Sequence, residues 1–325
     1  MSKNKFPNNI VFDYCIPNGV DKDWKNIIGC FLFYIKDINS VIKAETIEKI
    51  IFAIPETYEE AVKHVDKNQK VSNGSLAITL TNKNDDNTIS HHIIFNLTPY
   101  FFENLKYNKD TILNFPYLNI LSHEMAHIDL INNLHEIDDC ICFANIVNQI
   151  EKRRFLVELK RAFEEFFACK LSCSFYPDNE LEQSYKNHIF TYLEKISENQ
   201  EKFIKNYQIN NDYQSYFENS YKLLLNLFIY CGYYLGCRQE NSQLIQSNFI
   251  DMKRLENIFN QFYEYFYNIG KYRETINLNI FDDLINYFEE ILEEKCFIKI
   301  DRINNRINTP KLKMDLLYFI KNIES

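Results

Sequence analysis

A five-residue stretch, His123-Glu124-Met125-Ala126-His127, constrains the fold of this chain more than any other feature of its sequence. Apolar residues recur around it at helical spacing, namely Leu118, Ile120, Leu121, Met125, Ile128, Leu130, Ile131 and Leu134. This periodicity predicts a helix lodged in a hydrophobic core, and Pro116 fits the start of that helix. Residues four apart share one face of a helix, so the imidazoles of His123 and His127 can point at one metal ion.

The stretch also matches the HExxH motif, in which two histidines bind zinc and the glutamate acts on a zinc-bound water. Glu124 follows the first histidine directly, so it would stand beside that water rather than among the ligands. We therefore predict that His123 and His127 are zinc ligands and that Glu124 is the general base of a hydrolytic site. The alternative interpretation is an ordinary buried helix whose two histidines are satisfied by hydrogen bonds.

A third ligand is needed, because a catalytic zinc ion usually has three protein ligands and one water. The metzincin extension of the motif requires glycine at position 130 and histidine at position 133, but this chain has Leu130 and Asn133. A glutamate at the short spacing found in thermolysin would fall near position 147, which is Val147. The short spacing is therefore disfavoured, and a third ligand further along the chain is favoured.

Glu165 is the better candidate for the third ligand. It lies in a predicted helix over residues 152–175 whose other positions are largely apolar, and a carboxylate in such a segment is costly to bury unless it meets a cation. Ala168, one turn further on, would let this helix approach the HExxH helix closely. Two alternatives stay open: Glu164 could be the ligand instead, or both glutamates could lie on the solvated face of an amphipathic helix.

The HExxH stretch followed at a distance by Glu165-Phe166-Phe167-Ala168 resembles the gluzincin metallopeptidases, and is most similar to the small intracellular enzymes of the ImmA/IrrE type. The resemblance implies a zincin-like domain in which the glutamate of an ExxA pattern completes the zinc site. It also implies zinc as the cofactor and a protein substrate, such as a regulatory protein. Cys169 departs from this family, where an aspartate or asparagine usually follows the alanine.

The segment Ile89–Leu97 is rich in strand-forming residues and predicts a strand before the HExxH helix. The resemblance implies that this strand is the edge of the sheet, where an extended substrate peptide would pair with it. His91 and His92 are adjacent in the strand and should point to opposite faces, which argues against their binding the same metal ion.

Peptide hydrolysis also calls for a donor to the tetrahedral oxyanion, usually a histidine or tyrosine. The sequence does not single one out, and the candidates are His135, Tyr230, Tyr233 and Tyr234. A second metal site is conceivable at the cysteine pairs Cys140/Cys142 or Cys169/Cys173. Neither pair has the CxxC spacing of a zinc ribbon, so reduced core thiols are the favoured interpretation.

The composition limits the classes of function. The net charge of −9 does not favour nucleic-acid binding, which normally needs a basic surface. Residues 1–5 are not followed by an apolar region, so we expect no secretory signal. The longest apolar stretch, Leu223–Cys237, contains Asn226 and is too short to cross a bilayer, so it predicts a buried core helix. Together with the scattered cysteines, these features favour a cytoplasmic protein without membrane partners.

The pattern along the chain predicts an α+β protein, with a small mixed or antiparallel sheet around the HExxH helix and a largely α-helical C-terminal half. We expect strands at Asn9–Tyr14, Gly29–Tyr34, Lys49–Ile54, Leu76–Thr81 and Ile89–Leu97. Thr57-Tyr58-Glu59-Glu60 has the pattern of a capping box that opens a helix. Beyond residue 100 we expect helices only, among them 180–207, 211–239, 250–268, 279–295 and 310–323.

We accordingly divide the chain into a metallopeptidase domain, residues 1–176, and a helical region, residues 177–325. The favoured function is a zinc-dependent endopeptidase that hydrolyses peptide bonds of a protein through a zinc-activated water. The alternative is a non-catalytic helical interaction protein with a structural or vestigial metal site, in which the helices after residue 177 carry the function. The sequence does not specify the substrate, the cleavage specificity or the oligomeric state.

Overall fold

The structure, a computed structural model, describes residues 6–15, 24–69, 76–83, 88–97, 116–143, 150–210, 212–239, 241–272, 280–296, 298–301 and 306–308. The chain forms two compact units. Unit 1 comprises Met1–Asn132 and Phe167–Asp178, and unit 2 comprises Asn133–Phe166 and Asn179–Ser325. The division falls inside two continuous helices, α4 (Pro116–Phe143) and α5 (Ile150–Phe175). The predicted domain boundary near residue 176 stays a prediction.

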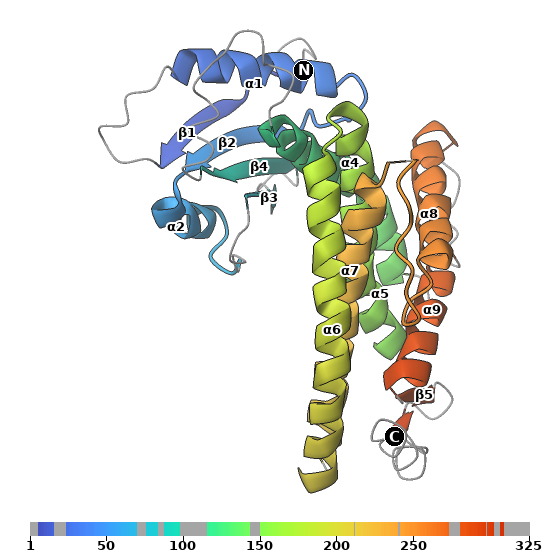
Figure 1. Cartoon of the computed structure of the whole chain (residues 1–325). Helices are drawn as coiled ribbons and strands as arrows, with labels where there is room; N and C mark the ends of the chain where they lie inside the picture. Colours follow the sequence, from blue (N-terminus) through green and yellow to red (C-terminus); the bar gives the residue numbers. More distant parts are fainter. Residues whose placement is uncertain are drawn as a thin grey trace. The chain divides into compact units, whose positions relative to one another are not determined.

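Unit 1 contains a four-stranded sheet in the order β1-β2-β4-β3 (Figure 1). Its strands are β1 (Val11–Cys15), β2 (Ile47–Ala53), β3 (Ala77–Lys83) and β4 (Ile89–Asn96). β1, β2 and β4 run parallel, whereas β3 pairs antiparallel with β4. The sheet is therefore mixed, and the prediction of an α+β protein with a small mixed sheet is confirmed.

The position of β4 corrects one expectation. The strand before the HExxH helix was expected at the edge of the sheet, but β4 lies between β2 and β3 and is hydrogen-bonded to both. It cannot offer a free edge, because its backbone groups are used on both sides. Among the described strands, β3 takes the edge position on this side of the sheet.

Helices cover both faces of the sheet (Figure 1). On one face, α1 (Trp24–Ile38) places the ring of Phe31 edge-on against Phe52 and Phe95, at 5.2 and 5.5 Å between ring centroids. On the other face, α2 (Pro55–Val65) packs Tyr58, Ala61 and Val62 against Ile51, Ala53 and Ile94. Side chains alternate along a strand, so each central strand supplies apolar residues to both helices.

Three local predictions were wrong. The segment Gly29–Tyr34 lies inside α1 rather than in a strand, because its short apolar run belongs to a longer helical pattern with buried Ile35 and Ile38. The capping-box residues do not open α2, which begins at Pro55 with Ile54 as N-cap and no side-chain cap. Beyond residue 100, a two-stranded sheet of β5 (Lys299–Asp301) and β6 (Arg306–Asn308) accompanies the helices.

Four helices that the sequence predicted build most of unit 2. They are α6 (Asn179–Asn210), α7 (Tyr213–Cys237), α8 (Met252–Tyr272) and α9 (Ile280–Cys296). The apolar stretch Leu223–Cys237 lies in α7, where Phe228 is buried against the ring of Phe288, as expected of a core helix. None of the described helices combines the length and apolarity needed to span a membrane. The predicted helix at 310–323 lies outside the described residues.

A close contact between backbones fixes α5 within unit 2. Gly232 of α7 lies against Ala162 of α5, and a Cβ atom at position 232 would overlap the carbonyl oxygen of Ala162. The rings of Phe163 and Phe166 on α5 pack against Phe262 and Phe259 of α8, at 5.3 and 5.1 Å between centroids. The absence of a side chain at Gly232 thus lets α7 approach the part of α5 that precedes Glu165.

We expect Gly232→Ala to lower the free energy of unfolding by about 1–3 kcal/mol, because an added methyl group at this contact forces the helices apart. Gly29→Ala is the matched control, since a Cβ at this exposed position of α1 meets nothing within 4 Å. The control should instead stabilise its helix by about 0.5–1 kcal/mol. Urea unfolding followed by circular dichroism measures both changes. Wild-type stability in Gly232→Ala would contradict the close approach.

Candidate metal centre

Helix α4 brings the two motif histidines together as predicted. His123 and His127 lie one turn apart, with 4.7 Å between ring centroids and 3.1 Å between their Nε2 atoms. The helix is held in the core by the fully buried residues Leu121, Met125, Ala126 and Ile128. The two imidazoles are half-buried. Their Nε2 atoms therefore converge on one point at the margin of the core.

Glu165 of α5 completes a group of three metal-binding side chains. One nitrogen of each histidine and one carboxylate oxygen of Glu165 all lie within 4.8 Å of one another. Glu165 stands two residues before the unit boundary in α5, on the same unbroken helix as the segment that unit 1 includes. Glu164 points elsewhere, with its carboxylate 3.4 Å from the ammonium of Lys160. Of the two glutamates that the sequence left open, Glu165 is the one beside the histidines.

The donor set fits a divalent metal ion. Glu165 is only 7% exposed, and a buried carboxylate is costly without a cation. Arg161 lies 3.9 Å from its Oε1, but the Arg161 side chain is 64% exposed, so water screens this ion pair. A metal ion would stabilise the carboxylate more strongly. Two imidazoles and one carboxylate suit zinc, and they also suit other transition metals, so the donor set alone does not select zinc.

Glu124 is not part of this group of ligands, and its role as a base stays a prediction. Its side chain is buried, and its Oε2 accepts a hydrogen bond of 2.7 Å from the Thr79 hydroxyl. Thr79 belongs to β3, the edge strand, and sequence reasoning missed this contact. No local signal could have found it, because the two residues are 45 positions apart and meet only when β3 pairs with β4.

His91 and His92 are structural residues of β4, as predicted. His91 is fully buried, with its Nδ1 3.1 Å from the Thr81 hydroxyl and its Nε2 3.2 Å from the Asn132 side-chain oxygen. His92 instead lies 3.5 Å from the Glu48 carboxylate. Burial lowers the pKa of both histidines. Neither belongs to the metal-binding group.

The cysteine side chains do not form the alternative metal site in the part of the chain that the structure describes. The described cysteines are reduced rather than joined in disulfide bonds, namely Cys169, Cys173, Cys231, Cys237 and Cys296. The sulfur of Cys173 accepts a hydrogen bond of 3.6 Å from Asn119, whereas the sulfur of Cys169 lies 3.7 Å from Nδ1 of His123. The side chains of Cys140 and Cys142 lie outside the described residues.

The tyrosines considered as oxyanion donors serve the packing of unit 2. Tyr230 stacks on His188 at 5.1 Å between centroids, and Tyr233 stacks on Tyr185 at 4.8 Å. The Tyr234 hydroxyl donates to the carbonyl of Gln243, at 3.3 Å. The structure assigns none of these three tyrosines to the metal-binding group, and the side chain of His135 lies outside the described residues.

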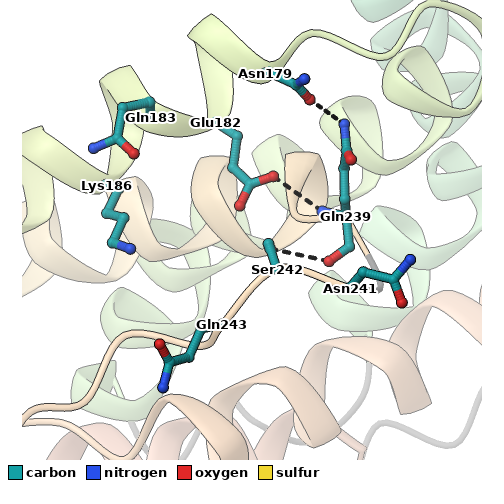
Figure 2. Close-up of a pocket in the computed structure, with 8 residues that line it drawn as sticks. All are labelled: Asn179, Glu182, Gln183, Lys186, Gln239, Asn241, Ser242 and Gln243. Atoms are coloured by element: carbon teal, nitrogen blue, oxygen red, sulfur yellow. Dashed lines mark hydrogen bonds between the residues drawn. The ribbon is translucent and has the colours of Figure 1, made fainter.

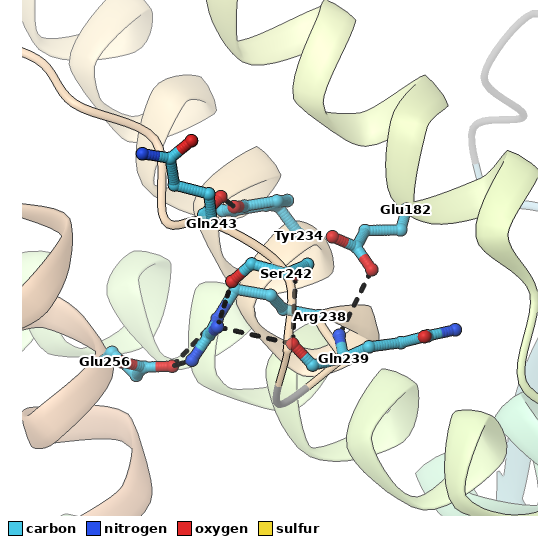
Figure 3. Close-up of polar contacts among 7 residues, drawn as sticks. All are labelled: Glu182, Tyr234, Arg238, Gln239, Ser242, Gln243 and Glu256. Carbon is cyan, nitrogen blue, oxygen red and sulfur yellow. Dashed lines mark hydrogen bonds and ion pairs between the residues drawn. The ribbon is translucent and has the colours of Figure 1, made fainter.

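Unit 2 also carries a polar pocket between the start of α6 and the segment after α7 (Figure 2). Its lining comprises Asn179, Glu182, Gln183, Lys186, Gln239, Asn241, Ser242 and Gln243. Glu182 accepts a hydrogen bond from the backbone nitrogen of Gln239, at 3.1 Å. Next to it, Arg238 pairs with Glu256 and donates to the carbonyl of Ser242 (Figure 3). These contacts stabilise the turn after α7.

A scan against protein-family models matches no family, and searches of the curated proteins and of the solved structures return no match. The functional interpretation therefore depends on the motif and on the geometry around it.

Acid should destabilise the fold through His91. Burial lowers the pKa of this histidine below its ordinary value of 6.5, so below pH 6.5 the unfolded chain binds a proton that the folded chain resists. The free energy of unfolding should then fall by on the order of 1 kcal/mol for each unit by which the folded pKa is lowered. Urea midpoints at neutral pH and near pH 5.5, with a chelator present, measure this loss. In His91→Gln, which does not titrate, the loss should be smaller, and an equal loss would contradict the assignment.

Proposed function

We propose that this protein is a zinc-dependent endopeptidase of the gluzincin type, with His123, His127 and Glu165 as ligands and Glu124 as general base. The observation that carries the proposal is the convergence of the three ligand side chains. The third ligand, Glu165, comes from a separate helix, α5, and is buried among largely apolar residues. A HExxH motif that occurred by chance would have no reason to meet a buried carboxylate. The gluzincin assignment further draws on the Glu165 to Ala168 pattern.

The chemistry divides between the metal and the protein. A zinc ion bound to these ligands would acidify a water molecule and polarise the scissile carbonyl. Glu124 would take the proton from the attacking water and deliver it to the leaving amine. The hydrogen bond from Thr79 to Oε2 of Glu124 keeps that carboxylate oriented and leaves its other oxygen available for the proton.

The proposed substrate is an extended segment of a protein, such as a regulatory protein, and β3 is the strand that would receive it. Among the described strands, β3 occupies the sheet edge, so one row of its backbone groups can pair with a peptide. Thr79 joins this strand to Glu124, so a peptide added to β3 would run beside the base. The described cysteines are not joined in disulfide bonds, which supports a reducing compartment such as the cytoplasm.

The ligand assignment predicts the metal content of four variants. Wild-type protein should retain zinc after purification, whereas His123→Ala, His127→Ala and Glu165→Ala should each bind zinc at least about tenfold more weakly. Glu164→Ala is the matched control, because its carboxylate pairs with Lys160 and should leave binding unchanged. Elemental analysis and chelator competition measure these affinities. Stoichiometric zinc in all three ligand variants would refute the assignment.

The role of Glu124 predicts a separation of metal binding from catalysis. Glu124→Gln should retain zinc but cleave peptides about 10²- to 10⁴-fold more slowly, because the amide cannot accept the proton of the attacking water. A pool of internally quenched peptides of mixed sequence serves as the probe. Undiminished cleavage by this variant would exclude Glu124 as the base. If the wild-type protein binds zinc yet cleaves nothing in the pool, a non-catalytic metal site becomes the better interpretation.

A further inference from the structure

Helix α5 contributes a second residue near the metal-binding group, in addition to Glu165. Cys169 stands one turn after Glu165 on the same helix and is fully buried. Its sulfur lies 3.7 Å from Nδ1 of His123, within reach of a hydrogen bond to sulfur. The helix that contributes Glu165 therefore also contacts one of the histidines that Glu165 joins.

The two ring nitrogens of His123 face different neighbours. Nε2 lies 3.1 Å from Nε2 of His127, on the side of the three-residue group. Nδ1 faces the Cys169 sulfur on the opposite side of the ring. A neutral imidazole carries one proton, so if Nε2 binds a metal, Nδ1 must carry the proton and act as a donor. The thiol sulfur is then the acceptor.

We propose that Cys169 is a positioning residue of the metal centre, which accepts the Nδ1 proton of His123 and so holds Nε2 toward the metal. This inference rests on the proposed zinc site. Partners of this kind fix the tautomer and orientation of a ligating histidine, and their loss typically weakens metal binding 10- to 100-fold. They are usually carboxylates, carbonyls or waters. A thiol sulfur is a weaker acceptor, so this site should bind zinc less tightly than the same site with a carboxylate at position 169.

Zinc affinity of the full-length protein tests the proposal without any substrate. Competition with a chromophoric chelator gives the dissociation constants of wild type, Cys169→Ala, Cys169→Ser and Cys169→Asp. We expect Cys169→Ala to bind zinc about 10- to 100-fold more weakly, since it removes the acceptor. Cys169→Ser should stay close to wild type, because its hydroxyl can also accept. Cys169→Asp should bind at least about tenfold more tightly.

A matched control and a second measurement separate positioning from packing. Cys231→Ala removes another fully buried helical thiol, outside the metal-binding group, and should leave zinc affinity unchanged. Thermal unfolding of the metal-free variants reports on packing alone. Cys169→Asp should destabilise the metal-free protein, because it buries a carboxylate, while it tightens zinc binding. If Cys169 had a purely structural role, its replacement by aspartate would lower both the stability of the metal-free protein and the zinc affinity.

The outcomes distinguish this inference from the proposed function. If wild type binds zinc but Cys169→Ala stays within about twofold of it and Cys169→Asp binds no more tightly, the positioning role is wrong and the zinc site stands. If wild type binds no zinc, the zinc site and the positioning role both fall. Should Cys169→Ala not fold, the serine and aspartate variants still decide the question through their affinities.

Discussion

The polar attachment of α4 to the sheet is the constraint on which the candidate centre depends. Thr79 binds Glu124, and two turns further along the helix the Asn132 side chain links His91 to the Thr46 hydroxyl, which accepts from Asn132 at 2.9 Å. His123 is directly adjacent to the first attachment in sequence, and His127 lies between the two. A buried hydrogen bond contributes about 1 kcal/mol net, but leaving one partner unsatisfied costs about 1–3 kcal/mol. Rotation of α4 about its axis would break both attachments, so the direction of the histidines is fixed.

The environment of α5 explains how a carboxylate can be both buried and directed. Glu165 stands between Phe163 and Phe166, whose rings pack against α8. The aromatic rings are packed within unit 2, whereas the carboxylate of Glu165 belongs to the three-residue group with His123 and His127. Because Gly232 has no side chain, α7 can contact the α5 backbone directly at Ala162. The orientation of the acidic group thus follows from where its apolar neighbours pack.

Sequence reasoning reached the elements of the centre but not the contacts that orient them. The HExxH helix and the helix of Glu165 were predictable, since each has a long periodic pattern, and the apolar context of Glu165 marked it as a ligand candidate. The short apolar run Gly29–Tyr34 was misassigned because such runs suit strand and helix alike. The edge position of β3 and its contact with Glu124 depend on the order of the strands in the sheet, and a single sequence does not reveal that order.

If a protein segment pairs with β3 and is cleaved as proposed, the antiparallel edge strand would limit where it is cut. Side chains alternate across a strand, so Thr79, which contacts α4, and Thr81 lie on the same face of β3, and a chain paired with β3 would follow the same pleat. A slip by one residue would turn every side chain of that chain to the opposite face. Cleavage on such an edge would therefore be selective for alternate positions, with neighbouring allowed cuts two residues apart, roughly 6.5–7 Å along the strand. The spacing of the cuts would then be set by the two-residue repeat of the strand.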